Sequence, residues 1–197
     1  MFACQVISLQ ELPQSARTRA ADLYWQAFGA KLGRLLGPDR RAMQLLARVI
    51  RADHALVALS PEGEVIGVIG YRTRNGGFVV LDEPDMCAVY GALGGRLRHA
   101  LIAWATQEVE NKRFPIDGLA VAPEWRGRGV GALLLNALAE VARGMGYSAL
   151  RLDVADENPR AKALYERLGF VEISRDRRPL LAPIFGMKGS TGMELRL

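Results

Sequence analysis

The sequence of 197 residues has few of the residues that build disulfide frameworks or metal sites. It holds two cysteines, Cys4 and Cys87, and two histidines, His54 and His99. Two cysteines do not make the disulfide framework of a small secreted domain, so a reducing cytoplasm is the expected compartment. Cysteine and histidine show no clustering with the spacing of a metal site, and we expect no bound metal.

Long apolar runs and a secretion signal are lacking as well. The N-terminus, "MFACQVISLQELPQ", has no basic stretch followed by an apolar one, so it does not resemble a signal peptide. The longest apolar runs are far shorter than the roughly 20 residues that cross a bilayer. Half of the residues are apolar, and we expect a single globular domain over residues 1–197 without a membrane partner.

Blocks of like charge are also missing, although the formal net charge is +5. Nearly all of the 26 basic residues are arginine. They are scattered along the chain, without the interleaved aromatic residues of a nucleic-acid-binding surface. The sequence therefore does not favour a nucleic acid as a partner. It favours an anionic small molecule more strongly.

Hydrophobic periodicity predicts three helices and a hairpin before residue 112. We expect a short strand at residues 3–9, followed by a helix from an N-cap at Ser15 to a stop at Gly29. The other elements predicted here are a helix at 39–50, a β-hairpin at 54–73 that turns at 61–64, and a helix at 85–111 with an apolar stripe of Leu93, Leu97, Leu101 and Trp104.

The rest of the chain alternates strands and helices. A strand is expected at 115–122, and a glycine-rich turn leads from it into a helix at 130–143. A short helix follows, which Asn158 caps ahead of Pro159 and Gly169 ends. Further strands are expected at 148–154, 170–174 and 191–197. This alternation predicts an α/β (α+β) fold, a mixed central sheet flanked by helices.

The glycine-rich turn, "RGRGVGA", has the composition of an anion site. The first turn of a helix leaves backbone N–H groups unpaired, and the helix dipole adds partial positive charge there. Gly127, Gly129 and Gly131 let the backbone approach a ligand closely, and Arg126 and Arg128 add donors for phosphate oxygens. We interpret the turn as a phosphate-binding loop rather than a plain connection.

The turn alone leaves the kind of phosphate ligand open. A nucleoside-triphosphate loop needs Lys and then Ser or Thr after its last glycine, whereas Ala132 and Leu133 stand there. The dinucleotide fingerprint allows a final alanine, so Gly127-x-Gly129-x-x-Ala132 is a weak match to it. Asp153 would then be the acidic residue expected about 20 positions further on.

A second motif resolves this choice. The stretch "RLDVADENPRAKALYERLGF" follows the next strand, and with "LAVAPEWRGRGVGALLL" it closely resembles the GNAT superfamily of acetyl-CoA-dependent N-acetyltransferases. The first match is to the family's R/Q-x-x-G-x-G/A loop, and the second is to its N-x-x-A-x-x-L-Y-x-x-x-G-F helix. The matching residues of that helix are Asn158, Ala161, Leu164, Tyr165, Gly169 and Phe170. The resemblance implies one GNAT domain with its CoA-binding core at about residues 116–175.

The resemblance implies that acetyl-CoA is the cosubstrate. In this family, the strand before the loop carries a bulge whose free backbone groups pair with pantetheine, a role that falls on Leu119, Ala120 and Val121. Asn158 and Ala161 would lie beside the pantetheine arm. The residues that would hold the pyrophosphate are Arg126, Gly127, Arg128, Gly129, Val130, Gly131 and Ala132.

The resemblance also implies direct attack of an amine on the acetyl group. Tyr165 would be the general acid, because a phenol of pKa near 10 can protonate a thiolate of pKa roughly 8.5 without a large shift. An amine of pKa near 10.4 is mostly protonated at neutral pH, and Asp117 or a water chain is the candidate base. Neither cysteine falls in the motif region, so we expect no covalent relay.

The resemblance leaves the acceptor open. In this family the acceptor pocket forms from the first helices, the hairpin region and the loop before the last strand, which here are Tyr24, Trp25, Phe28 and residues 175–189. A small amine, an aminoglycoside, an amino acid and a protein N-terminus are all consistent with the sequence. The alternative function is a non-catalytic acyl-CoA sensor or scaffold of the same fold, and exposed sheet edges would allow a homodimer.

Overall fold

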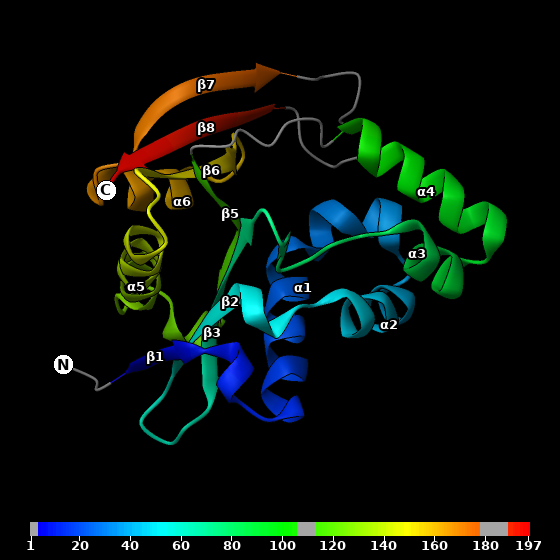
Figure 1. The fold of residues 1–197 in the computed structure, drawn as a ribbon, viewed down its shortest axis with the longest axis horizontal. Helices are drawn as coiled ribbons and strands as arrows, with labels where there is room; N and C mark the ends of the chain where they lie inside the picture. The colour runs from blue at the N-terminus through cyan, green and yellow to red at the C-terminus, as the bar shows by residue number, and fades with distance from the viewer. Residues whose placement is uncertain (1–3, 106–112, 178–188) are drawn as a thin grey trace.

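A mixed eight-stranded sheet runs through the molecule in the order β1-β2-β3-β5-β6-β8-β7, with β4 paired to β3 (Figure 1). The computed structural model describes residues 4–105, 113–177 and 189–197. The strands are β1 (Gln5–Ser8), β2 (Ala55–Leu59), β3 (Val65–Thr73), β4 (Gly76–Gly77), β5 (Phe114–Val121), β6 (Ala149–Ala155), β7 (Val171–Arg177) and β8 (Gly189–Arg196).

Neighbouring strands of this sheet are antiparallel except for β5 and β6, which are parallel. That parallel pairing joins only Phe114 to Leu150 and Pro115 to Arg151. The rest of β5 therefore has an edge that β6 does not pair. A sheet with one short parallel pair is not the mostly parallel sheet of a dinucleotide-binding fold, so the weak dinucleotide match was misleading.

Helices cover both faces of the sheet (Figure 1). α1 and α2 lie on one face, and α5 lies on the other, where it packs against β2, β3 and β5. α3 packs on α2, and α4 packs on α3. The helices are α1 (Gln14–Leu36), α2 (Asp39–Val49), α3 (Glu83–Tyr90), α4 (Ala92–Ala105), α5 (Val130–Gly144) and α6 (Pro159–Arg167). The mixed sheet flanked by helices confirms the predicted fold class.

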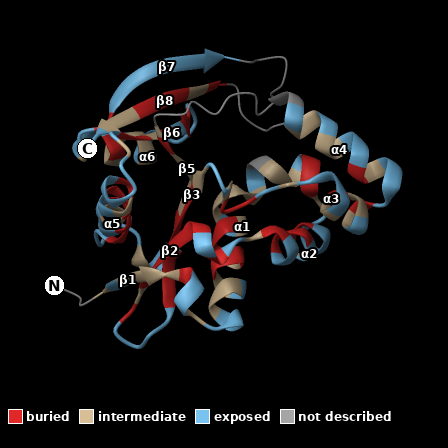
Figure 2. Cartoon of the chain, viewed as in Figure 1, coloured by how far each residue is buried: buried red, intermediate tan, exposed pale blue. Residues whose placement is uncertain are grey.

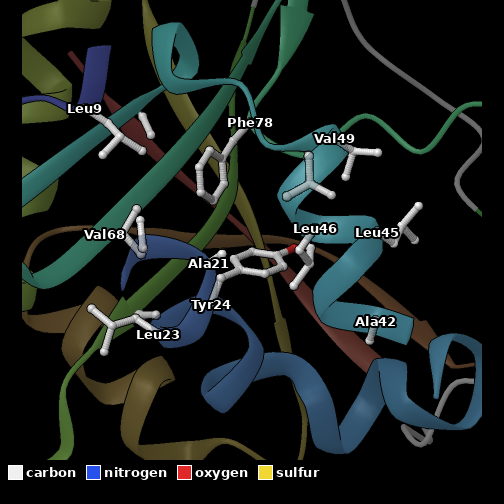
Figure 3. Close-up of a cluster of buried hydrophobic side chains, with 14 of the residues drawn as sticks. Leu9, Ala21, Leu23, Tyr24, Ala42, Leu45, Leu46, Val49, Val68 and Phe78 are labelled. Atoms are coloured by element: carbon white, nitrogen blue, oxygen red, sulfur yellow. The ribbon is translucent and has the colours of Figure 1, made fainter. Parts of the chain in front are cut away.

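Each face of the sheet carries its own apolar core. On the α1 side, Phe78, Leu45 and Leu46 are fully buried together with Tyr24 (Figure 3). On the α5 side, fully buried Leu134 anchors a second cluster against the sheet. Replacing such a leucine by alanine typically costs about 2–5 kcal/mol of folding free energy. The two cores fix α1 and α5 on opposite sides of β5, the strand that leads into the glycine-rich turn.

Exposure differs sharply between the centre and one edge of the sheet. β2 and β3 are buried along most of their length, whereas every residue of β7 is exposed (Figure 2). β7 is an edge strand, since it pairs only with β8. Among the described residues, helices long and apolar enough to cross a membrane are absent.

The first helix is longer than the sequence predicted. α1 runs past Gly29 to Leu36, and its N-cap residue is Pro13, so the predicted boundaries at Ser15 and Gly29 were wrong. A Cβ at Gly29 would lie 3.0 Å from the Trp25 indole. Gly29 therefore gives the indole room beside the helix instead of ending it.

The helix predicted at 85–111 was also wrong, because the chain breaks there into α3 and α4. Gly91, with φ of +79°, is the C-cap of α3, a conformation that residues with a Cβ rarely adopt. Two residues of the predicted apolar stripe, Leu93 and Leu97, are 85% and 63% exposed. The stripe is therefore not a core face at its first turns. The side chain of Trp104 and residues 106–111 lie outside the described part of the chain.

Other predicted elements are confirmed. The hairpin of β2 and β3 turns where expected, with the Gly63 N–H donating to the Ser60 carbonyl at 2.9 Å. α5 begins at Val130, and α6 follows its cap at Asn158, whose side-chain oxygen accepts from the Ala161 N–H at 3.1 Å.

Candidate functional site

The glycine-rich turn connects β5 to α5 through a short 3-10 helix, Pro123–Trp125. Gly127 and Gly129 have φ of +76° and +87°, in the left-handed region that favours glycine. Gly129 is the N-cap residue of α5 and offers no side chain to the helix terminus. Two of the glycines in the motif are therefore required by backbone conformation.

The amides at the start of α5 are available to a ligand. Within the described part of the chain, the N–H groups of Gly129, Val130, Gly131 and Ala132 have no hydrogen-bond partner. Four orphan N–H groups and the positive end of the helix dipole lie at this point. The terminus can therefore accept a phosphate or another compact anion.

The third glycine of the motif, Gly131, is explained by close packing and not by backbone conformation. A Cβ at Gly131 would lie 3.2 Å from Cδ2 of Leu164 on α6 and 3.7 Å from Cδ2 of Leu119 on β5. Gly131 thus lets β5, α5 and α6 meet without a gap. The loop and the helix of the second motif are adjacent in space, as their shared assignment to one ligand requires.

The arginines of the loop have partners already. Nε of Arg126 donates to the Val121 carbonyl at 3.0 Å and so ties the loop to the end of β5. The guanidinium of Arg128 lies 5.2 Å from the centre of the Trp125 ring, within range of a cation–π interaction. The sequence assigned both to phosphate, and the structure gives each a second role in ordering the loop.

A further arginine near the loop was missed in the sequence. A terminal nitrogen of Arg160, in the first turn of α6, lies 3.8 Å from the position that a Cβ of Gly127 would occupy. Within the described residues this guanidinium has no partner. It comes from the second motif, where its position next to Asn158 and Pro159 drew attention to the cap alone. Only the packing of α6 on the loop brings Arg160 to the glycines.

β5 carries a bulge, but at Asp117 and not at Leu119–Val121, to which the resemblance assigned it. Gly118 lies opposite Gly70 and Ile116 lies opposite Tyr71, so Asp117 is the extra residue between them. The residues assigned to pantetheine follow the bulge in regular register with β3. Their backbone groups on the β6 side have no strand partner there, because the β5–β6 pairing stops at Pro115. These residues are Leu119, Ala120 and Val121.

Asp117 is held by three donors. Its carboxylate forms an ion pair with Nε of Arg72 and accepts from the N–H groups of Phe78 at 3.0 Å and Val79 at 3.5 Å. The Asp117 side chain is 7% exposed. Burial raises the pKa of this carboxyl, and the Arg72 charge opposes the rise. The carboxylate therefore connects β5 to β3 and to the segment after β4.

Tyr165 and Asn158 lie on α6. Tyr165 is buried, with its ring 5.6 Å from that of Phe170, and its hydroxyl has no hydrogen-bond partner among the described residues. Burial raises the pKa of this phenol to about 12. The side-chain oxygen of Asn158 caps α6, which leaves its NH₂ group as a donor.

The aromatic residues assigned to the acceptor pocket come from α1. Tyr24 is 7% exposed, with its ring 4.6 Å from Phe28 and 5.6 Å from Phe78. A Cβ at Gly118 would lie within 3.0 Å of both the Phe28 and the Tyr24 rings, so these rings lie directly on β5. Trp25 is only partly buried against the same core. Most of the other predicted pocket segment, residues 178–188, lies outside the described part of the chain.

Residues 17–170 match the acetyltransferase (GNAT) family. Among curated relatives, streptothricin acetyltransferase of Streptomyces lavendulae is 36% identical over 62% of this chain and 61% of its own length. Thialysine N-epsilon-acetyltransferase of Bos taurus is 42% identical over 33% of this chain and 38% of its own length. The matched stretches thus cover less than two thirds of these relatives.

Solved structures agree on the fold. A GCN5-related N-acetyltransferase from Kribbella flavida has a TM-score of 0.64 at 20% identity, covering 99% of this chain and 98% of its own. An N-acetyltransferase from Staphylococcus aureus Mu50 has a TM-score of 0.65 at 16% identity, covering 97% and 100%. At these identities the likeness concerns the fold alone.

Proposed function

Because this chain belongs to the acetyltransferase (GNAT) family, we propose that it transfers the acetyl group of acetyl-CoA to a primary amine by direct attack. The proposal rests on the fact that two groups of unpaired backbone atoms lie next to each other. Unpaired amides at the start of α5 lie at the end of β5, and β5 has an edge that β6 leaves unpaired. A long cosubstrate with phosphates at one end and amide groups in its arm fits both.

The phosphates of CoA would lie at the loop. The amides from Gly129 to Ala132 would donate to pyrophosphate oxygens, and the terminal nitrogens of Arg160 and Arg126 would add charge-assisted donors. Nε of Arg126 would stay on Val121 and hold the loop in place. Gly127 and Gly129 supply the turn that exposes the amides.

The pantetheine arm would add to β5 as an extended strand adds to a sheet edge. Of the three residues assigned to the arm, Leu119 and the N–H of Val121 would supply backbone groups, because the Val121 carbonyl accepts from Arg126 and Ala120 pairs with Val68 on β3. The Asn158 NH₂ group would supply a donor from α6. Ala161 lies in the first turn of the same helix, and its small side chain would leave room beside the arm. The thioester would then lie near the bulge at Asp117.

Tyr165 would donate the proton that the leaving thiolate gains. With a pKa of about 12, the phenol stays protonated at every physiological pH. Transfer from it to a thiolate whose conjugate acid has a pKa near 8.5 is uphill by about 5 kcal/mol. The hydroxyl therefore acts first as a hydrogen-bond donor to the developing negative charge on sulfur, and a close thiolate receives the proton as the C–S bond breaks.

The amine proton would leave to water. Deprotonating an amine of pKa near 10.4 at neutral pH costs about 4–5 kcal/mol, so a base or a water chain is needed. Asp117 is the sequence candidate, but its carboxylate already accepts from Arg72, Phe78 and Val79. We assign Asp117 the role of a positioning residue that holds the bulge.

The reaction then balances without a covalent enzyme intermediate. The amine nitrogen attacks the thioester carbon, the C–S bond breaks, and the nitrogen loses a proton to water. Sulfur takes the proton of Tyr165, which solvent returns. The products are an N-acetyl amine and CoA.

The experiment that tests this function follows CoA thiol release from acetyl-CoA with a panel of primary amines, in the purified full chain. The panel should include thialysine and streptothricin, the acceptors in the names of the relatives. We expect amine-dependent thiol release with at least one acceptor. Tight CoA binding without turnover on any amine would instead favour an acyl-CoA sensor or scaffold.

A further inference from the structure

Beside β5, on the side of the sheet that α1 covers, two side chains have hydrogen-bond donors without a matching acceptor: Arg72 of β3 and Tyr24 of α1. We propose that Arg72 and Tyr24 form a subsite for a carboxylate of the acceptor, so that the acceptor is an amine of the amino-acid class. This inference rests on the proposed acetyl transfer and names the substrate class of the same site.

Arg72 is an oriented guanidinium with unused donors. Its Nε is bound to Asp117, and its aliphatic part lies over Gly77, where a Cβ would fall 2.7 Å from Cγ of Arg72. The side chain is 41% exposed, and the described residues give its two terminal nitrogens no partner. An arginine held through Nε presents the other two nitrogens as a fork, which matches the two oxygens of a carboxylate.

Asp117 does not bind the two terminal nitrogens of Arg72. Its own oxygens already accept hydrogen bonds and so are not available to a ligand. One oxygen accepts from Arg72, and the other accepts from the N–H groups of Phe78 and Val79. The carboxylate is almost fully buried behind them. A ligand group at this place must therefore bring its own acceptor oxygens, and a positively charged group would meet Arg72.

Tyr24 adds a second, independent observation. The phenol is buried, yet its hydroxyl has no hydrogen-bond partner among the described residues. Burial raises the pKa of this phenol, the Asp117 charge raises it further, and the Arg72 charge lowers it. The Tyr24 ring lies against Gly118, the neighbour of Asp117 in β5, and against Phe78, whose N–H donates to Asp117. Its ring is fixed edge-on against Phe78 (Figure 3).

The position fits an acceptor rather than the cosubstrate. Leu119 points to Gly131 and Leu164, on the face of the loop, whereas Asp117 and its partners lie on the face of α1. Asp117 precedes Leu119 by two residues at the bulge. An acceptor with its carboxylate on Arg72 can direct its amine across the bulge toward the thioester, while CoA occupies the opposite face.

The experiment compares ω-amino acids of one to five methylenes with their methyl esters, which keep the amine and remove the negative charge. Thiol release from acetyl-CoA gives kcat/KM for each pair. For the best spacer, we expect the acid to exceed its ester at least tenfold. In Arg72→Gln we expect this ratio to fall to about one, with the KM for acetyl-CoA within twofold of its original value. A ratio that stays above tenfold in Arg72→Gln would overturn the proposal.

Matched variants separate the subsite from general charge and from misfolding. Arg74→Gln removes a more exposed arginine from the turn after β3 and should leave the ratio unchanged. An equal loss there would overturn the proposal. Tyr24→Phe preserves the ring in the core and should lower the ratio severalfold. Arg72→Gln combined with Asp117→Asn removes both charges, so a loss of ratio in that folded protein cannot come from an unpaired buried carboxylate.

A binding measurement keeps this inference distinct from the proposed reaction. Calorimetry on the CoA complex compares N-acetyl ω-amino acids with their methyl esters. If no amine is turned over but the acids bind at least tenfold more tightly and lose this preference in Arg72→Gln, the subsite stands and the proposed transfer fails. If amines are turned over with equal rates for acids and esters, the transfer stands and the carboxylate subsite is wrong.

Discussion

The two faces of β5 offer different kinds of groups to a ligand. Toward α5 and α6, the groups available to a ligand are backbone amides, exposed by Gly127 and Gly129. Toward α1, they are side chains, and Arg72 and Asp117 meet there across 45 residues of sequence. Backbone groups keep their chemistry under most substitutions, whereas a side-chain subsite depends on each residue. We therefore expect the loop face to define the shared cosubstrate and the α1 face to define the acceptor.

The largest effect is expected at the loop face. Gly129→Asp should weaken CoA binding at least about 100-fold, because it strains a residue at φ of +87° and places a carboxylate at the amides. No atom lies within 4 Å of the added Cβ, so the fold has room for it. Calorimetric titration with CoA measures the loss. Gly63→Asp, at φ of +84° in the hairpin turn, is the matched control and should bind CoA normally. An unchanged affinity of Gly129→Asp for CoA would show that the loop is not part of the CoA site.

The next effect concerns the chemical step. Tyr165→Phe should lower kcat about 100-fold while the KM for acetyl-CoA stays within about twofold, because the proposed role of the hydroxyl is to act on the leaving sulfur and not on binding. Steady-state thiol release measures both constants. Tyr147→Phe, a ring packed on Phe114, serves as control and should keep kcat. Equal rates in Tyr165→Phe and the unchanged enzyme would show that Tyr165 has only a packing role in the core.

A smaller effect tests whether side chains contribute on the loop face too. Arg160→Gln should raise the Kd of CoA about tenfold, since one charge-assisted contact to phosphate is lost. The KM for acetyl-pantetheine, which carries no phosphates, should not change. Arg167→Gln removes an exposed arginine at the other end of α6 and is the matched control. A loss that appears equally with acetyl-pantetheine would place Arg160 away from the phosphates.

The smallest effect is expected at the bulge. Asp117→Asn should lower kcat/KM severalfold by loosening Arg72, while the rising limb of the pH–rate profile stays in place because water takes the amine proton. The control is Asp153→Asn, which replaces another carboxyl, on β6, whose pKa is raised by burial. It should leave both kcat/KM and the position of the rising limb unchanged. A rising limb that moves in Asp117→Asn alone would identify Asp117 as the base.

Sequence reasoning predicted the backbone elements of the loop face, the turn and the helix starts, because their signals are local. The turn, the start of α5 and the cap at Asn158 each depend on residues within a few positions of one another. The two remaining contacts of that face, Arg160 with Gly127 and Leu164 with Gly131, depend on how α6 packs on the loop. The hydrophobic pattern of a single sequence does not predict how two such elements pack on each other.

The α1 face was predicted less well, because similar residues do different things there. Gly29 and Gly91 look alike in sequence, yet one lies inside a helix beneath the Trp25 indole and the other ends a helix. Asp117 was noticed as an acid near the site. Its partner Arg72 lies on another strand and could be found only in the folded chain.

The extra residue at Asp117 also divides β5 into two halves of opposite parity. Phe114 and Ile116 pack toward α5, and so do Leu119 and Val121, although an odd number of positions separates the two pairs. If all these residues alternated regularly without a bulge, Leu119 would point away from α6 and Gly118 would stand in its place. Deletion of Asp117 would remove the bulge and leave both pairs on the α5 side. Regular alternation of all the present residues would instead exchange the two faces of the strand's second half, and with them the sides from which the proposed substrates would arrive.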